Sequence, residues 1–207
     1  CSFDDKVNYA LEGSVFIAGA AIQWLRDSLK VIGKASETEK IAQSIEKLHD
    51  IYVVPAFAGL GAPYWDMYSR GAIFGLTRDT GVDHIIKATL ESLAYQTKDI
   101  IDVMEKDSGI NLKSLKVDGG ACMNNYLMQF QSDLLDCEVL RPEIIETTAM
   151  GAGYLAGLQS NIWDKDQIIK NQKIDRSFNP AINDSEREKM YRGWKKAVNR
   201  TFNWIEK

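Results

Sequence analysis

The chain contains 207 residues and carries a net charge of −4, with 45% hydrophobic and 26% charged residues. This composition is ordinary for a globular protein, and the length is sufficient for one large domain with a buried core. A nucleic-acid-binding protein usually has a surplus of basic residues, and no apolar run here approaches the roughly 20 residues that a membrane helix needs. We therefore expect neither a nucleic-acid partner nor a membrane span.

The cysteines are typical of a reducing compartment. Cys1, Cys122 and Cys137 are an odd number and form no CxxC pair, so their spacing predicts neither a disulfide framework nor a zinc site. We expect no secretory segment at the start of the chain and a cytoplasmic location. The chain begins with Cys1 rather than with methionine, which is typical of a processed product or a fragment.

Hydrophobic periodicity predicts the elements of the first part of the chain. Residues 10–32 carry apolar side chains at alternating steps of four and three, which predicts an amphipathic helix. A polar helix is expected over residues 37–49. Residues 51–55 and 71–76 are typical of short strands, and the glycines and prolines of residues 58–70 predict a loop between them.

The remainder of the chain alternates helices with short strands. We expect helices over residues 82–107, 124–135, 147–158 and 184–205, and strands over residues 115–117 and 138–140. This alternation is typical of an α/β layered domain. From about residue 147 onward we expect only helices, the first of which is rich in alanine and glycine and is therefore expected to pack closely.

The segment KVDGGACMNN (residues 116–125) has the most informative local pattern. A strand ends at Gly119 and Gly120 and opens into a helix. Glycines let the backbone approach a ligand closely, and a helix N-terminus suits phosphate, with Asn124 placed to hydrogen-bond the ligand. The alternative is a tight turn with Asn124 and Asn125 near the helix cap, because the segment matches neither the dinucleotide fingerprint nor the P-loop.

A second candidate lies within the first expected helix. Gly19 would cost about 1 kcal/mol relative to alanine in a helix interior, so it usually has a packing or binding reason. Gly19 and Gln23 are four residues apart and share a face. One interpretation places a flat ring over Gly19 with Gln23 at its edge. The other is that Gly19 admits a neighbouring helix.

The loop Pro63-Tyr64-Trp65-Asp66 is followed by Arg70. Aromatic residues in a loop more often fasten it than bind a substrate, so we expect Trp65 to anchor the loop in the core. Asp66 and Arg70 are candidates for an ion pair. Substrate binding by this loop is the alternative.

The two histidines, His49 and His84, lie far apart in the sequence. Neither a Ser–His–acid triad nor a His/Cys metal site can be assembled from the residues present. We therefore assign no catalytic residue and no metal ligand within the chain.

Several motifs resemble the FGGY carbohydrate kinases. GAIFGL (residues 71–76), followed seven residues later by HIIKATLE (residues 84–91), is similar to a pattern of that family. Longer runs resemble the glycerol kinases within it, namely residues 9–27, 53–66, 70–78, 91–100, 117–135, 147–158 and 193–198. The resemblance covers essentially the whole chain.

This resemblance implies a fold and a site. FGGY kinases have two actin-like domains with ribonuclease H-like sheets, and this chain is similar to the second. It implies that residues 1–207 form one α/β, actin-like ATPase domain with a mixed sheet flanked by helices. Carried over residue by residue, Gly19, Gln23, Gly120 and Asn124 match nucleotide-contact positions, and ATP or ADP with Mg²⁺ is the implied cofactor.

The resemblance also implies a division of labour. In these kinases the catalytic aspartate and the glycerol-binding residues lie upstream of the position of Cys1, and the chain contains no Gly-Asp-Gln triplet. The implied function is the nucleotide-binding half of a kinase that, when intact, transfers the γ-phosphoryl group of ATP to glycerol. The implied partners are an N-terminal domain of the same protein and further copies in a homo-oligomer. This chain by itself is expected to be inactive.

Two alternatives to glycerol kinase remain open. One is another FGGY kinase, acting on a substrate such as xylulose or gluconate. The other is a non-catalytic, actin-like binding module.

Overall fold

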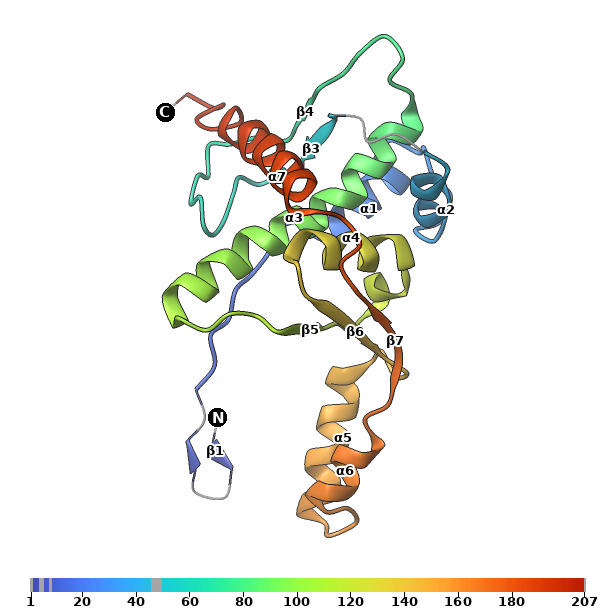
Figure 1. The fold of residues 1–207 in the computed structure, drawn as a ribbon, viewed down its shortest axis with the longest axis vertical. Helices are drawn as coiled ribbons and strands as arrows, with labels where there is room; N and C mark the ends of the chain where they lie inside the picture. Colours follow the sequence, from blue (N-terminus) through green and yellow to red (C-terminus); the bar gives the residue numbers. More distant parts are fainter. Residues whose placement is uncertain (1, 4–5, 8, 46–49, 207) are drawn as a thin grey trace.

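The computed structural model describes residues 2–3, 6–7, 9–45 and 50–206. Helix α3 (Val82–Ser108) runs through the middle of the molecule (Figure 1). It ends at Gly109, whose φ of 69° lies in the left-handed region that favours glycine. Residues 86–95 of α3 are all buried, so other elements cover this part of the helix on every side. The helix predicted over residues 82–107 is confirmed.

A three-stranded mixed sheet lies on one side of α3. β5 (Ser114–Lys116) is parallel to β6 (Glu138–Pro142), and β7 (Ile174–Phe178) pairs antiparallel with the other edge of β6. Helix α4 (Asn125–Leu135) connects β5 to β6 and packs against α3. The structure thus has the mixed sheet with flanking helices that the resemblance implied.

Strand β7 corrects the expectation that residues from about 147 onward are all helical. Four of its five residues are exposed, and Asp175 and Arg176 interrupt any apolar alternation. The strand forms because its backbone pairs with β6, with Val139 opposite Phe178. That pairing partner lies more than 30 positions away, so no local pattern predicts it.

The N-terminal region corrects the expectation of a long first helix. Only α1 (Gly19–Gln23) and a π-helical turn, η1 (Trp24–Ser28), form within residues 10–32. Gly13 passes so close to Ile100 of α3 that a Cβ atom there would clash with that side chain. Gln96 of α3 donates a hydrogen bond to the carbonyl oxygen of Ile17 (3.0 Å). Contacts with α3 therefore replace the internal hydrogen bonds of a helix. Before this segment, β1 (Ser2–Phe3) pairs with β2 (Lys6–Val7).

Helix α2 (Glu37–Ser44) covers the same end of α3 as α1. The polar helix expected over residues 37–49 ends at Ser44, since Ile45 is extended, and residues 46–49, including His49, lie outside the described residues. The amino group of Lys87 donates to the carbonyl oxygen of Ile45 (3.0 Å). This contact fastens the C-terminal end of α2 to α3.

An antiparallel pair, β3 (Tyr52–Val54) and β4 (Ala72–Phe74), and helix α7 (Asp184–Asn199) pack on the other side of α3. The centre of this layer is Trp194, whose ring stacks on Tyr95 with 5.2 Å between centroids. Helix α7 ends at Asn199 and is therefore shorter than the helix predicted over residues 184–205. The strands expected over residues 51–55 and 71–76 are confirmed.

Helices α5 (Thr147–Gln159) and α6 (Lys165–Asn171) project away from the α3 region (Figure 1). Gly157 is the one buried residue of α5, and a Cβ atom there would clash with Trp163. The expected close packing of this helix is therefore limited to the side facing Trp163, whose ring also contacts that of Tyr154 (5.5 Å between centroids).

Candidate functional site

A cavity of about 310 Å³ lies between α1, α2, α3 and the turn that leads into α4. All four residues that the resemblance marked as nucleotide contacts line it: Gly19, Gln23, Gly120 and Asn124. They come from two segments about 100 positions apart in the sequence. Apolar side chains of Ile22, Leu90, Leu93, Met123 and Leu127 form much of the remaining wall.

The two glycines leave open space on the cavity wall. A Cβ atom added at Gly19 or at Gly120 would meet no atom within 4 Å. Gly19 therefore does not admit a neighbouring helix in this structure, so that interpretation of its position is not supported. An apolar cavity with open backbone surface and a few polar groups is the usual form of a small-molecule site.

The glycine turn has the geometry of a strand-to-helix junction. Gly119 follows β5 with φ of 74°, and a short 3₁₀ helix, η2 (Gly120–Met123), precedes α4. Asn124 is the N-cap of α4, because its side-chain oxygen accepts a hydrogen bond from the backbone N–H of Leu127 (2.9 Å). Its side-chain nitrogen donates to Oγ1 of Thr38 (3.1 Å). Asn124 thus joins α4 to α2 at the wall of the cavity.

Arg141 of β6 supports the turn from the sheet side. Its guanidinium group is almost completely buried and donates to the backbone carbonyl of Cys122 (3.0 Å) and to the side-chain oxygen of Asn125 (3.1 Å). Nε of the same group donates to Asp175 of β7 (2.8 Å). The ion pair gives the buried charge a partner, which a buried arginine requires. The central strand β6, supported by the edge strand β7, therefore holds the turn in place.

Helix α2 contributes residues that the sequence analysis did not single out. Thr38 and Glu39 line the cavity, and Glu39 accepts a hydrogen bond from Asn125 (2.8 Å). Arg26 of η1 also lines it and pairs with its neighbour Asp27 (2.6 Å). The region around α2 carries no motif, so the sequence offered no signal for these residues. Only the packing of α2 against α3 and α4 brings them to the site.

No residue of the described chain stands out as a metal ligand or as a catalytic group. The described residues contain no group of three or more His, Cys, Asp or Glu side chains that could hold a metal ion. His84 lies at the start of α3, where its Nδ1 atom accepts a hydrogen bond from the backbone N–H of Gly81 (3.0 Å). The acidic residue of the cavity wall, Glu39, is engaged with Asn125.

The loop at residues 63–66 is not anchored in the way that the sequence predicted. The side chain of Trp65 is 73% exposed and does not anchor the loop in the core. Asp66 forms no ion pair with Arg70: it accepts hydrogen bonds from Tyr68 and Ser69 (2.8 Å each) and from the backbone of Asn203 (2.8 Å). These bonds lower the pKa of the Asp66 carboxyl, and the bond from Asn203 makes the largest contribution. The Asp66 carboxylate and the ring of Tyr64, which packs against the core beside Phe202, therefore fasten the loop in place of Trp65.

A second, larger cavity lies between the sheet and α5. It has a volume of about 470 Å³ and is lined by Asp118, Thr147 and Tyr154 among others. The Thr147 hydroxyl donates a hydrogen bond to the Asp118 carboxylate. None of the four sequence-predicted site residues lines this cavity. The candidate nucleotide site is therefore the smaller cavity beside α4.

Comparison with known families identifies the class of this protein. A model of the FGGY family of carbohydrate kinases, C-terminal domain, matches residues 2–160. The chain therefore belongs to the FGGY family of carbohydrate kinases, and the resemblance found in its motifs is confirmed.

Two of its relatives within that family are named glycerol kinase. A glycerol kinase of Alkaliphilus metalliredigens is 60% identical over 202 residues, which are 97% of this chain and 40% of that protein. A glycerol kinase of Caldanaerobacter subterraneus is 60% identical over 204 residues, 98% of this chain and 41% of that protein. The chain thus spans about two-fifths of the length of these relatives.

Solved structures agree on the fold. Plasmodium falciparum glycerol kinase with ADP superimposes with a TM-score of 0.84 at 38% identity, over 91% of this chain and 38% of that one. Gluconate kinase from Lactobacillus acidophilus gives a TM-score of 0.74 at 19% identity, over 90% of this chain and 38% of that one, which supports the fold alone. The domain has the actin-like ATPase fold. Among the described residues, no helix is long and apolar enough to cross a lipid bilayer.

Proposed function

We propose that this chain supplies the nucleotide-binding half of an ATP-dependent glycerol kinase, which transfers the γ-phosphoryl group of ATP to glycerol. The main support is the single cavity that gathers Gly19, Gln23, Gly120 and Asn124 from two distant segments. Relatives of about 60% identity are named glycerol kinase, and a relative of the same fold was solved with ADP. In this proposal residues 1–207 form one C-terminal, nucleotide-binding domain.

The residues of the cavity suit a nucleotide in distinct ways. A purine ring stacks on the open backbone of Gly19, with the side-chain amide of Gln23 at its edge, while Leu90 and Leu93 exclude water from its other surfaces. The backbone at Gly120 can approach the ligand closely because no Cβ atom intervenes. The first turn of α4, behind Asn124, presents N–H groups toward the phosphate end.

The rest of the reaction requires groups beyond those assigned in this chain. Mg²⁺ bound to ATP neutralises charge on the phosphates during transfer, and Mg²⁺ is commonly held by substrate phosphates with few protein ligands. Binding of Mg²⁺ mainly through the phosphates agrees with the cavity wall, because its acidic side chain, Glu39, already accepts a hydrogen bond from Asn125. In the proposed enzyme the glycerol-binding residues and the general base belong to an N-terminal domain. We also propose a cytoplasmic enzyme that forms homo-oligomers.

The nucleotide site is tested by titrating ADP with Mg²⁺ calorimetrically into this chain and into the complete gene product that carries it. Asn124→Ala is the test variant, and Asn183→Ala is its matched control. Both asparagines are N-caps that accept a backbone N–H bond, Asn124 for α4 and Asn183 for α7. Each loss of a cap costs about 1 kcal/mol of stability, but only Asn124 lines the cavity.

We expect Asn124→Ala to weaken ADP binding and Asn183→Ala to leave it unchanged. If the wild type, Asn124→Ala and Asn183→Ala bind ADP with equal affinity, Asn124 is not part of the nucleotide site. Absence of ADP binding in the complete gene product would overturn the nucleotide-binding function itself.

Substrate choice is tested separately. The complete gene product should phosphorylate glycerol in preference to xylulose and gluconate, because the glycerol kinases are about 60% identical to this chain, whereas the gluconate and xylulose kinases of known structure are about 20% identical. Preference for xylulose or gluconate would place the protein elsewhere in the family. ADP binding without phosphorylation of any polyol or sugar would favour a non-catalytic module.

A further inference from the structure

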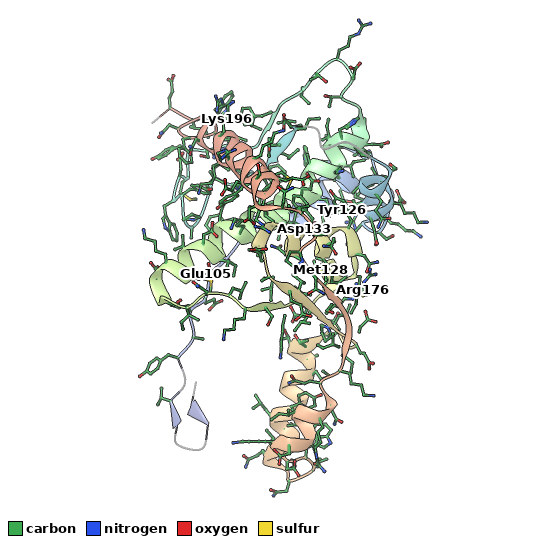
Figure 2. The ribbon with its side chains drawn as sticks, in the orientation of Figure 1. Glu105, Tyr126, Met128, Asp133, Arg176 and Lys196 are labelled. Atoms are coloured by element: carbon green, nitrogen blue, oxygen red, sulfur yellow. The ribbon has the colours of Figure 1, made fainter. Side chains whose placement is uncertain are left out.

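A buried carboxylate lies behind the nucleotide cavity and has no role in the proposed chemistry. Glu91 of α3 is 6% exposed, and its carboxylate accepts a hydrogen bond from the hydroxyl of Tyr126. Tyr126 is the second residue of α4 and lies between Asn124 and Leu127, both of which line the cavity. Figure 2 labels Tyr126 where α4 meets α3. One hydrogen bond therefore connects the centre of α3 to the first turn of α4.

Hydrogen bonds hold the first turn of α4 from three directions, namely from α2, from the sheet and from α3. Asn124 and Asn125 bond to Thr38 and Glu39 of α2. Arg141 of β6 bonds to Asn125 and to the carbonyl just before the turn. The Tyr126 contact differs from these two in kind, because its acceptor is a deeply buried carboxylate.

We propose that Glu91 is a positioning residue for nucleotide binding: when ionised, it holds Tyr126, and with it the first turn of α4, in the conformation that completes the cavity. This inference rests on the proposed nucleotide site. A hydrogen bond to an ionised carboxylate is roughly twice as strong as one between neutral groups. Protonation of Glu91 therefore weakens the attachment of the turn to α3, and nucleotide affinity falls with it.

The surroundings of Glu91 place its titration near neutral pH. Burial raises its pKa from the usual 4.5 to about 7, although the Tyr126 bond and the charge of Lys87 lower it. The other titratable groups facing this region are Tyr52 of β3, Asp50 just before that strand, Tyr95 of α3 and Asp133 of α4. Burial raises the pKa of Tyr126 well above its ordinary value, so its hydroxyl remains a donor throughout the physiological range.

The chain offers a matched control on the same helix. Asp99 of α3 is also buried and accepts a hydrogen bond from a tyrosine, Tyr191 of α7, at 2.6 Å. Neither Asp99 nor Tyr191 lines the nucleotide cavity. Tyr191→Phe therefore removes a tyrosine–carboxylate hydrogen bond of the same type without touching α4.

The experiment measures the Kd of ADP with Mg²⁺ between pH 5.5 and 8.5 in the complete gene product. The proteins compared are the wild type, Tyr126→Phe, Glu91→Gln and Tyr191→Phe, each first shown by circular dichroism to be folded. Phosphate groups themselves titrate near pH 6. Ratios of variant to wild-type Kd at each pH remove this shared contribution of the ligand.

We expect Tyr126→Phe to weaken ADP binding about threefold to tenfold at pH 8, with a smaller effect at pH 5.5, where Glu91 is already protonated. Glu91→Gln should remove the pH-dependent step that Glu91 contributes, so its Kd ratio to wild type rises with pH. Tyr191→Phe should bind ADP as the wild type does at every pH.

Two outcomes overturn the inference and are distinct from each other. If wild type binds ADP but the Kd ratios of Tyr126→Phe and Glu91→Gln stay constant with pH, Glu91 has no positioning role and the proposed function is unaffected. If the wild type binds no ADP at any pH, the proposed function fails, and this inference fails with it.

Discussion

Helices α3 and α5 both carry many apolar side chains, but other elements cover only α3. Residues 86–95 of α3 are buried without interruption, whereas Leu155 of α5 is 59% exposed and Gly157 is the one buried position of that helix. The hydrophobic effect is proportional to the apolar area removed from water. Apolar composition therefore stabilises this chain in the region around α3 and contributes little in the projecting α5–α6 pair.

The largest expected effect comes from making the same change, leucine to alanine, in each of the two regions. Leu134 of α4 is fully buried against the α3 region, so Leu134→Ala should lower the free energy of unfolding by about 2–5 kcal/mol. Leu155→Ala in α5 should change it by less than about 0.5 kcal/mol. Urea denaturation followed by circular dichroism measures both. Similar losses would show that α5 is covered as well as the α3 region.

A second pair compares glycines. Gly75, next to β4, has φ of 84°, and a Cβ atom there would clash with the backbone carbonyl of Asp50. Gly75→Ala should therefore destabilise the fold by about 2 kcal/mol or more. Gly153 of α5 faces open space, and Gly153→Ala should raise the helicity of α5 and stabilise it by about 0.5–1 kcal/mol. Thermal unfolding measures both, and a destabilised Gly153→Ala variant would show that α5 has a close neighbour at that position.

The pH dependence of stability tests the buried carboxylate of α3. Because burial raises the pKa of Glu91 to about 7, the folded state binds a proton more tightly than the unfolded state. The resulting stability is complete below about pH 4.5 and is lost as pH rises through about 7, by on the order of 1–3 kcal/mol. Burial raises the pKa of Asp99 as well, which acts in the same direction.

Urea denaturation at several pH values between 4.5 and 8 measures this dependence. Glu91→Gln should flatten the curve, and Asp99→Asn should remove the separate contribution of Asp99. A wild-type curve that rises with pH over this interval would contradict the assignment of a raised pKa.

The smallest expected difference concerns helix caps. Asn183 caps α7 by accepting from Glu186, and Asp164 caps α6 by accepting from Gln167 (2.8 Å). Asn183→Ala should lower global stability by about 1 kcal/mol, because α7 carries the buried Trp194. Asp164→Ala should accelerate hydrogen exchange within α6 and leave the global unfolding midpoint unchanged. An equal loss of global stability in both variants would show that α6 unfolds together with the α3 region.

The elements with strong local signals could be predicted from the sequence. The periodicity of α3 and the strand–glycine–helix junction at Gly119 each have a local physical cause, and both are present in the structure. Local pattern singled out the four candidate site residues but left both glycine motifs ambiguous, and the family resemblance favoured their interpretation as nucleotide contacts. That they share one cavity emerged from the fold.

Other features depended on contacts between distant segments. Residues 10–18 carry helical periodicity but lie against α3 without helix, β7 exists because β6 offers its edge, and Thr38 reaches the cavity because α2 packs beside α4. The sequence by itself determined the class of domain, its central helix and the glycine turn, since these depend on residues close together in the chain. Only the tertiary structure decided the N-terminal path, the third strand and the full cavity wall, because pairing and burial between remote segments override weak local preferences.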